Sequence, residues 1–395
     1  MAERVVIHVG APKTGTSFVQ DRLFRNPQAL AAQGVLYPGD RPDAHFLAAL
    51  DLMGLKWGGL EAEAVGYWRR LVDQVNAHQG TAIISHEIFG IATAEQVATA
   101  LAEFGGAEIH VVASARDLAR QIPAEWQENV KHRRELPYAT FLQRIQDPAR
   151  DSVLGWWFWG VQHIPEVLGR WAADVAPERV HLVTVPPSGS APETLWQRFV
   201  TALGISDEGF DLEAERANPS LGVPESDLVR RLNVLLKPVL PNHHYRPLVR
   251  EVLVHQNLSR RRDSARLSLP PEAYDWVGGL AEEWISELAG RGYDVIGDLA
   301  ELRPAPPADF VDPDHSDPGQ VAEAGLAGLA AMVVEAARLR DQHTELEARI
   351  ADLEGAIARI EAAPDYRVKK KLVELAHTNP LTKSGLAAYR KAFRR

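Results

Sequence analysis

Residues 4–20, Arg-Val-Val-Ile-His-Val-Gly-Ala-Pro-Lys-Thr-Gly-Thr-Ser-Phe-Val-Gln, decide the fold of this chain. The run from Val5 to Val9 is apolar and typical of a buried strand; it ends at Gly10, and a helix is expected to start near Gly15. A strand, a glycine-rich turn and a helix in this order direct several backbone N–H groups and the positive end of the helix dipole toward one point. The stretch therefore predicts a site for a phosphate or sulfate group.

Side chains in the turn strengthen this prediction, because Lys13 adds a mobile positive charge and the residues after it add hydroxyl groups. The common nucleotide-binding pattern GxxxxGK[ST] places its lysine after the last glycine, whereas Lys13 precedes Gly15. The turn instead resembles the 5′-phosphosulfate loop of sulfotransferases that use 3′-phosphoadenosine 5′-phosphosulfate (PAPS). This resemblance implies a catalytic role for Lys13 and donor binding by Pro12, Lys13, Thr14, Gly15, Thr16 and Ser17.

The composition is that of a globular protein with one large domain or two smaller ones. The chain has 395 residues, of which 46% are hydrophobic and 24% charged. It has no cysteine, which excludes disulfides, thiolate metal sites and cysteine nucleophiles and fits a reducing, cytoplasmic compartment. We expect no signal peptide, because a strand starts within five residues. We also expect no transmembrane segment, because the most apolar run, 321–337, is short and carries Glu323 and Glu335.

The net charge of −10 is unevenly distributed along the chain. Residues 364–395 contain nine Lys or Arg against two Asp or Glu, which leaves about −17 for the residues before them. Because an acidic protein binds nucleic acid poorly, no nucleic-acid partner is expected. The basic tail, 363–395, could contact anionic lipid at the inner membrane surface or an acidic glycan, or it could be a solvated terminal helix.

Apolar strands alternate with helical segments in the first half of the chain. This pattern predicts βαβ units and an α/β, P-loop-like three-layer fold with a mostly parallel central sheet and a helical second half. Ligands of such sheets lie at the carboxyl ends of the strands. Gly10, His86 and Arg116 each follow such an end, so we expect them to converge. The expected strands are 5–9, 35–37, 81–85, 108–114 and 179–185, and the main expected helices are 16–24, 45–52, 61–76, 95–104, 154–173, 194–203, 226–237, 244–254 and 272–291.

A second phosphate-binding element is predicted at the end of the strand 108–114. The planar guanidinium of Arg116 can bind a phosphate with two hydrogen bonds. The segment from Arg116 to Trp126 is similar to the 3′-phosphate segment of the same sulfotransferases, except that Leu118 replaces a Pro and Ala124 replaces the phosphate-binding Ser. The resemblance implies that Arg116 and the position of Ala124 hold the 3′-phosphate, with another group in place of the missing hydroxyl.

The strand 81–85 is followed by His86 and Glu87, and the resemblance implies that a residue here takes the proton of the acceptor. An imidazole and a carboxylate are both suited to general-base catalysis. Neighbouring residues at a strand end point to opposite faces, so only one is expected to face the donor. We prefer Glu87 and place His86 second, since His86 could also be a core histidine.

The resemblance covers about residues 1–304 and implies sulfuryl transfer from PAPS to a hydroxyl or amine of a carbohydrate, glycolipid or small metabolite. No acidic pair is placed for Mg²⁺, so no metal is expected. One alternative is a nucleotide-dependent kinase on a related fold, which the order of Lys13 and Gly15 disfavours. Another is a catalytically inactive coiled-coil scaffold, which Ala124 favours. The aromatic run 156–159 could line an acceptor pocket or pack in the core.

The remaining chain divides into a linker, 305–320, a helix, 321–362, and the basic tail, 363–395. The linker is rich in Pro and Asp. The helix carries a heptad repeat, and because a single helix would expose this seam, we expect a parallel coiled-coil homodimer with His343 as a polar seam residue. The seam residues are Leu329, Met332, Ala336, Leu339, His343, Leu346, Ile350, Leu353, Ile357 and Ile360.

Overall fold

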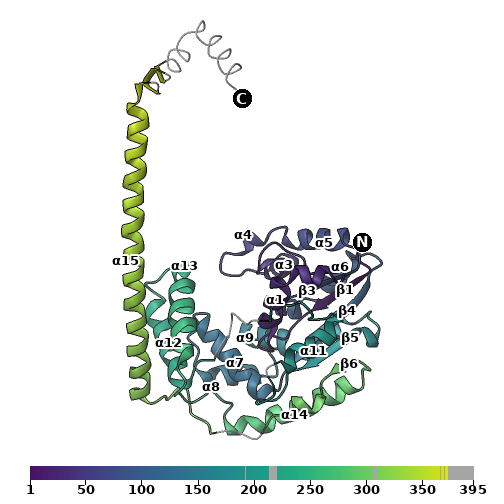
Figure 1. Cartoon of the computed structure of the whole chain (residues 1–395). Coiled ribbons are helices and arrows are strands. Elements are labelled where there is room, and N and C mark those ends of the chain that lie inside the picture. The colour runs from purple at the N-terminus through teal and green to yellow at the C-terminus, as the bar shows by residue number, and fades with distance from the viewer. Residues whose placement is uncertain (192, 213–219, 306–308, 365, 369, 372–395) are drawn as a thin grey trace. The chain divides into compact units, whose positions relative to one another are not determined.

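The computed structural model describes residues 1–371 except 192, 213–219, 306–308, 365 and 369, and it divides into two units, 1–328 and 329–395 (Figure 1). The first unit contains a six-stranded sheet in which every pair of neighbours is parallel. The predicted α/β fold with a mostly parallel sheet is confirmed. The strands, in the spatial order β2-β3-β1-β4-β5-β6, are β1 (Arg4–His8), β2 (Val35–Leu36), β3 (Thr81–Ser85), β4 (Glu108–Ala115), β5 (Val180–Thr184) and β6 (Asp294–Ile296).

Strand β1 lies at the point where the direction of strand addition changes. The chain first adds β2 and β3 on one side of β1 and then β4, β5 and β6 on the other. Open parallel sheets bind ligands at such a switch point, beyond the carboxyl ends of the strands. These ends are held together by main-chain bonds: the amide of His86 donates to the carbonyl of His8 at 3.1 Å, and that of Ala11 donates to Ser114 at 3.0 Å.

Helices connect the strands and cover the sheet (Figure 1). The helices before β4 are α1 (Thr16–Arg25), α2 (Pro27–Ala31), α3 (Ala44–Met53), α4 (Glu61–Ala64), α5 (Tyr67–Ala77), the 3₁₀ helix η1 (Glu87–Ile91) and α6 (Ala94–Ala102). Those between β4 and β5 are α7 (Leu118–Lys131), α8 (Tyr138–Gln146), α9 (Val153–Gln162), α10 (Ile164–Trp171) and η2 (Pro177–Arg179). The later ones are α11 (Thr194–Leu203), α12 (Val223–Leu236), α13 (Asn242–Tyr245), the π-helix η3 (Arg246–Asn257), η4 (Leu258–Arg260), η5 (Pro271–Ala273), α14 (Tyr274–Ala289), η6 (Leu299–Leu302) and α15 (Pro318–Ala362).

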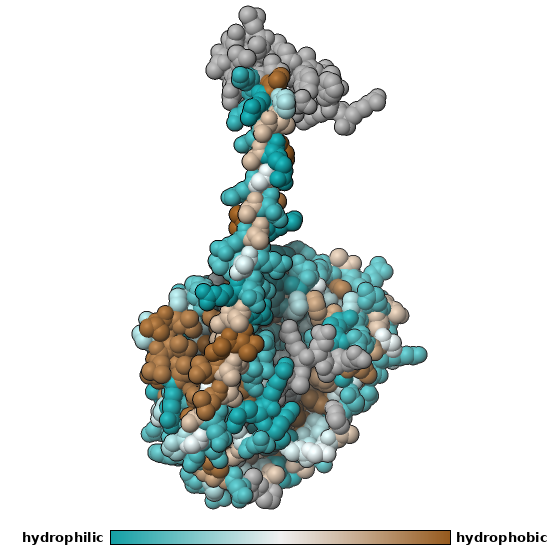
Figure 2. All heavy atoms as spheres, turned by 60° about the vertical axis from the view of Figure 1, so that its left-hand side comes forward, coloured by the Kyte–Doolittle hydropathy of each residue, from teal (hydrophilic) through white to brown (hydrophobic). Residues whose placement is uncertain are grey.

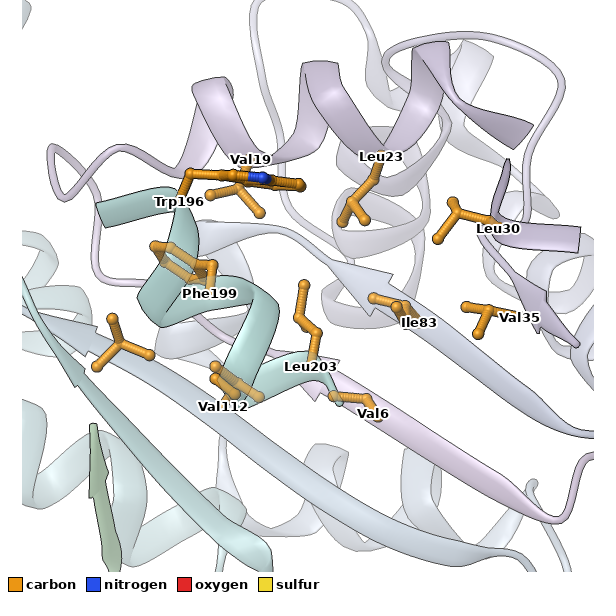
Figure 3. Close-up of a cluster of buried hydrophobic side chains, with 12 residues drawn as sticks. Val6, Val19, Leu23, Leu30, Val35, Ile83, Val112, Trp196, Phe199 and Leu203 are labelled. Carbon is orange, nitrogen blue, oxygen red and sulfur yellow. The ribbon is translucent and has the colours of Figure 1, made fainter. Parts of the chain in front are cut away.

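Helices α1 and α11 pack side by side on one face of the sheet (Figure 3). Val19 and Leu23 lie four residues apart on α1 and therefore share one helix face. Full burial of one such side chain contributes about 1.5–3 kcal/mol, so this contact fixes α1 and the turn before it on the sheet. The buried cluster includes Val6, Val19, Leu23, Ile83, Val112, Trp196, Phe199 and Leu203.

Several elements differ from the prediction. The expected helix 61–76 is two helices, α4 and α5, and the expected helix 154–173 is interrupted at His163. The short edge strand β6 and the helix α7 were not expected. Helix α7 was missed because it contains Pro123, a residue that disfavours the interior of a helix. Its start is stabilised by Asp117, whose side chain accepts from the amide of Arg120 at 3.0 Å.

Helix α15 has 45 residues, and the division between the two units falls within it, after Gly328. Its first turns belong to the first unit, where Val321, Ala324 and Gly328 are buried. The predicted domain boundaries at 304 and 320 stay a prediction, and most of the predicted basic tail lies outside the described residues. Among the described helices α15 is long and apolar enough to cross a membrane by length and composition, so the statement that the most apolar run is too short is wrong, whereas the expectation of no transmembrane segment stays a prediction. Length and composition alone carry no membrane assignment.

Candidate functional site

Two glycines shape the turn between β1 and α1. Gly10 has a φ of 114°, and a Cβ atom there would lie 3.2 Å from the carbonyl oxygen of Glu87, so glycine permits the close approach of η1. Gly15 has a φ of 90°, and a Cβ atom there would lie 2.6 Å from the Leu195 side chain of α11. Gly15 precedes α1, whose first turn receives no side-chain cap. Amides of an uncapped first turn, together with the helix dipole, favour an anion.

Polar side chains bind the main-chain carbonyls of the turn between β1 and α1. The hydroxyl of Thr14 is buried and donates to the carbonyl of Ala11 at 2.6 Å. Gln121 of α7 donates to the carbonyl of Pro12, and Gln162 of α9 donates to the same carbonyl at 3.4 Å. The side chain of Thr14 therefore supports the turn from inside.

Arg116 reaches the turn from the end of β4. Its Nη1 donates to the carbonyl of Lys13 at 3.3 Å, which joins the two predicted anion-binding elements. The Nε atom of Arg116 is buried and has no hydrogen-bond partner. Burial lowers the pKa of the guanidinium to about 10, and the charge of Arg120 contributes to the shift, so the group stays charged at neutral pH. A largely buried cation at the turn fits an anionic ligand.

The ammonium group of Lys13 forms an ion pair with Glu128 of α7. The carboxylate of Glu128 also lies 3.1 Å from Nε2 of His132, 3.7 Å from Nη2 of Arg250 and 3.9 Å from Nζ of Lys131. Burial alone would raise the pKa of Glu128, but the hydrogen bond with His132 and the charges of Lys13 and Lys131 outweigh it and hold this pKa well below its ordinary value. The carboxylate is therefore ionised and keeps Lys13 at the turn.

His86 and Glu87 lie on the same side of the sheet edge, with Nε2 and Oε2 4.0 Å apart. The expectation that they point to opposite faces is wrong, because the backbone leaves the strand and Glu87 begins the 3₁₀ helix η1. Nδ1 of His86 accepts from the amide of Ile88 at 3.2 Å, and Gln20 of α1 donates to Glu87 at 3.0 Å. The second bond links α1 to the predicted base.

Burial and neighbouring charges decide the protonation of this pair. Burial alone would raise the pKa of Glu87, but the charge of His86, a main-chain amide and the bond from Gln20 outweigh it and lower the pKa. Burial lowers the pKa of His86, and the negative charge of Glu87 opposes this only in part. At neutral pH Glu87 is therefore ionised and can accept a proton, whereas neutral His86, whose Nδ1 accepts from the amide of Ile88, carries its proton on Nε2.

Helix α7 contributes a second carboxyl group that the sequence analysis missed. Glu125 is buried, and its Oε1 accepts from Gln162 at 3.0 Å. Burial raises its pKa to about 7, and the charges of Glu128 and Glu87 also raise it, whereas Lys13 lowers it. The signal was available, because Gln121, Glu125, Glu128 and His132 follow helical spacing and form one polar stripe.

Aromatic rings connect the two sides of the site. The ring centroid of Phe46 of α3 lies 5.3 Å from that of His86 and 5.7 Å from that of Trp57. Trp57 in turn lies 5.4 Å from Trp157 and 6.4 Å from His132, the partner of Glu128. The rings of Phe46, Trp57 and Trp157 are half-buried. Within the predicted aromatic run, the other members divide between surface and core, with Trp156 53% exposed and Phe158 and Trp159 buried.

Ala124, at the position of the missing hydroxyl, is half-buried on α7 one turn after Arg120. Residues four apart share a helix face, so Arg120 is the nearest cation along this face. Its guanidinium pairs with Asp117 and donates to the carbonyl of Pro186 at 3.0 Å.

The structure brings the predicted site residues together at one edge of the sheet, although their roles stay predictions. The turn and the first turn of α1 contain Pro12, Lys13, Thr14, Gly15, Thr16 and Ser17, with Thr16 buried and Ser17 exposed. Among the described residues, no group of three or more His, Asp or Glu is arranged to hold a metal ion. The expectation of a reaction without metal also stays a prediction.

Comparison with protein-family models and with curated proteins gives no match. Among solved structures, the chain is similar to a sulfotransferase from Alicyclobacillus acidocaldarius. The two share 19% sequence identity with a TM-score of 0.39, over 66% of this chain and 100% of that one. At this identity and score the likeness carries no evidence on activity.

Proposed function

We propose that this chain is a PAPS-dependent sulfotransferase. The observation that carries the proposal is the hydrogen bond from Arg116 to the carbonyl of Lys13. It joins an element suited to a 3′-phosphate to a turn suited to a 5′-phosphosulfate, although the two lie about a hundred residues apart in the chain. A nucleotide with anionic groups at both its 3′ and 5′ positions fits such a pair of elements.

The residues at the turn fit this donor in charge and in free hydrogen-bond capacity. The first turn of α1 has no side-chain cap, and the guanidinium of Arg116 beside it is largely buried and charged. Both would bind anionic oxygens, the turn at the 5′ end and Arg116 at the 3′ end. Arg120 would take the place of the hydroxyl missing at Ala124. When bound, PAPS supplies the sulfuryl group that is transferred to the acceptor.

Lys13 and Glu87 would carry the chemistry. Lys13 stabilises negative charge on the leaving phosphate oxygen, and the paired Glu128 holds its ammonium group at the turn. Glu87 accepts the proton of the acceptor hydroxyl or amine and is kept ionised and oriented by Gln20. His86, 4.0 Å away, either assists Glu87 or replaces it as the base.

The acceptor would enter from the side of Phe46, Trp57 and Trp157. These half-buried rings lead from His86, beside Glu87, to His132, which binds the Glu128 partner of Lys13. Aromatic faces bind sugar rings and flat apolar groups. This agrees with a carbohydrate, a glycolipid or a small hydroxylated metabolite as acceptor.

The test compares nucleotides in a thermal-shift assay and then measures transfer of labelled sulfate from PAPS to cell extracts. We expect stabilisation by 3′-phosphoadenosine 5′-phosphate (PAP), no effect of ATP, and labelled product. Stabilisation by ATP alone would indicate the kinase. Binding of neither nucleotide, or binding of PAP with no labelled product in any extract, would indicate a scaffold without activity.

A further inference from the structure

Beyond Gly328, helix α15 exposes a regular row of large apolar side chains. Five of them are each more than half exposed, and a continuous exposed row of this kind marks an interaction surface more often than single exposed leucines do. They are Leu346 (62%), Ile350 (55%), Leu353 (51%), Ile357 (56%) and Ile360 (58%). Figure 2 shows hydrophobic atoms at intervals along this helix among mainly hydrophilic ones.

We propose that residues 329–361 bind the same segment of a second copy of this chain as a parallel, in-register, two-stranded coiled coil. The row follows the heptad steps of three and four residues that this packing requires. The a positions are Leu329, Ala336, His343, Ile350 and Ile357, and the d positions are Met332, Leu339, Leu346, Leu353 and Ile360. Isoleucine at a with leucine at d, as in Ile350 and Leu353, favours two parallel strands.

Charges beside the seam specify the orientation. In a parallel dimer each g residue faces the e residue five positions later on the other helix. Arg349 at g would face Glu354 of the second copy, and Glu335 at g would face Arg340 of the second copy. Residues five apart are not neighbours on one helix, so a single helix does not explain the complementarity of Arg349 and Glu354, whereas Glu335 also pairs with Arg338 of its own helix. An antiparallel pair would place e against e, and three of the four e residues from 340 to 361 are acidic.

Neither the first unit nor a membrane accounts for the seam. The side chains of α15 that are buried, at Val321 and Ala324, lie at g and c positions and not on the a and d seam. The apolar stretch that resembles a membrane span lies toward the start of α15, whereas residues 338–361 carry ten charged side chains. Such a density of charge is incompatible with hydrocarbon.

The first experiment measures the mass of the full-length protein by light scattering over a range of concentrations. We expect a dimer for the wild type. Ile350→Glu, which places a charge in the seam, should raise the dissociation constant at least a hundredfold. Val334→Glu is the matched control, because Val334 is 70% exposed at an f position on the outside of the coiled coil, and it should remain dimeric.

The second experiment measures orientation and uses the absence of native cysteine. Under mild oxidation, Leu353→Cys at d should form a disulfide-linked dimer, whereas Ala348→Cys at f should not. Arg349→Glu should weaken the dimer, and Arg349→Glu with Glu354→Arg should restore it. Helicity measured by circular dichroism checks that each variant folds.

Three results would overturn the proposal. They are a monomer at every concentration, a dimer that Ile350→Glu leaves intact, and cross-linking at Ala348→Cys as fast as at Leu353→Cys. A monomeric wild type that floats with anionic lipid vesicles, and loses this binding in Val334→Glu, would identify a membrane surface as the partner instead.

Discussion

The guanidinium of Arg116 donates a hydrogen bond to the main-chain carbonyl of Lys13 across 3.3 Å, and its Nε atom, buried beside that bond, has no partner. The bond connects the carboxyl end of β4 to the turn after β1. Because the two strands are parallel neighbours, their carboxyl ends meet at one edge of the sheet. One ligand can therefore contact both groups.

Lys13→Ala should abolish sulfate transfer while the protein stays folded. Loss of one electrostatic stabiliser of the transition state typically lowers kcat by about 10²–10³. Glu128 keeps Lys131, His132 and Arg250 as neighbours, so its charge remains compensated. Steady-state kinetics measures the loss of transfer, and thermal unfolding checks that the variant stays folded. Lys56→Ala, on the surface, is the control, and near-normal turnover in Lys13→Ala would refute the role of Lys13.

Glu87→Gln should lower kcat by about 10²–10³ and leave PAP affinity unchanged, because Gln keeps the shape of the side chain but is not a base. His86→Asn should have a smaller effect. The pKa of Glu87 lies below its ordinary value, so wild-type activity should fall with acidification only below about pH 4.5 if Glu87 is the base. A larger loss in His86→Asn, with Glu87→Gln active, would exchange the two roles.

Glu125→Gln should change the pH dependence of stability. Burial raises the pKa of Glu125 in the folded protein to about 7, whereas an unfolded glutamate titrates near 4.5. The folded state therefore binds more protons between these values, and the wild type loses stability as the pH rises from 4.5 to 7, by on the order of 3 kcal/mol. The variant should lack this loss, because its amide stays neutral and still accepts from Gln162.

Urea unfolding of Glu125→Gln at pH 5 and pH 8 measures this difference. Glu208→Gln, at an exposed position, should behave as the wild type does. Equal loss of stability in the wild type and Glu125→Gln over this range would show that Glu125 is ionised in the folded protein throughout.

Trp57→Ala should raise the KM for the acceptor about tenfold, since an aromatic contact contributes about 0.5–1.5 kcal/mol beyond the area that it buries. PAP affinity should not change. Trp156→Ala is the control. It removes a ring that is 53% exposed and that contacts the ring of Trp157. The acceptor KM of this control should stay near the wild-type value, and an equal rise in both variants would argue against an acceptor site at Trp57.

The sequence predicts those parts of the site that follow a strand directly. The turn after β1, Arg116 after β4 and Glu87 after β3 converge because parallel strands present their carboxyl ends at one edge. This reasoning needs no knowledge of tertiary packing. Adjacent local patterns, an apolar run and then a glycine or a charged residue, are sufficient.

The parts contributed by α7 and by the aromatic row were not predictable in the same way. Pro123 argues against a helix at this position in the sequence. Unless the segment is read as a helix, Glu125 and Glu128 do not share one face. The contact between Trp57 and Trp157 joins residues a hundred positions apart, and no periodicity relates them. The direction of Glu87 depends on where β3 ends, which is the kind of boundary that sequence patterns fix least well.

The most direct test of the central claim is calorimetric titration of two nucleotides into the wild type and Arg116→Ala. The nucleotides are PAP and adenosine 5′-phosphosulfate, which lacks the 3′-phosphate. Arg303→Ala, which removes an exposed arginine paired with Glu282, is the control. We predict that Arg116→Ala weakens PAP binding by about tenfold to a hundredfold, as expected for a charged hydrogen bond of 1.5–3 kcal/mol, and leaves binding of adenosine 5′-phosphosulfate unchanged. Equal PAP affinity in the wild type and Arg116→Ala would contradict the account.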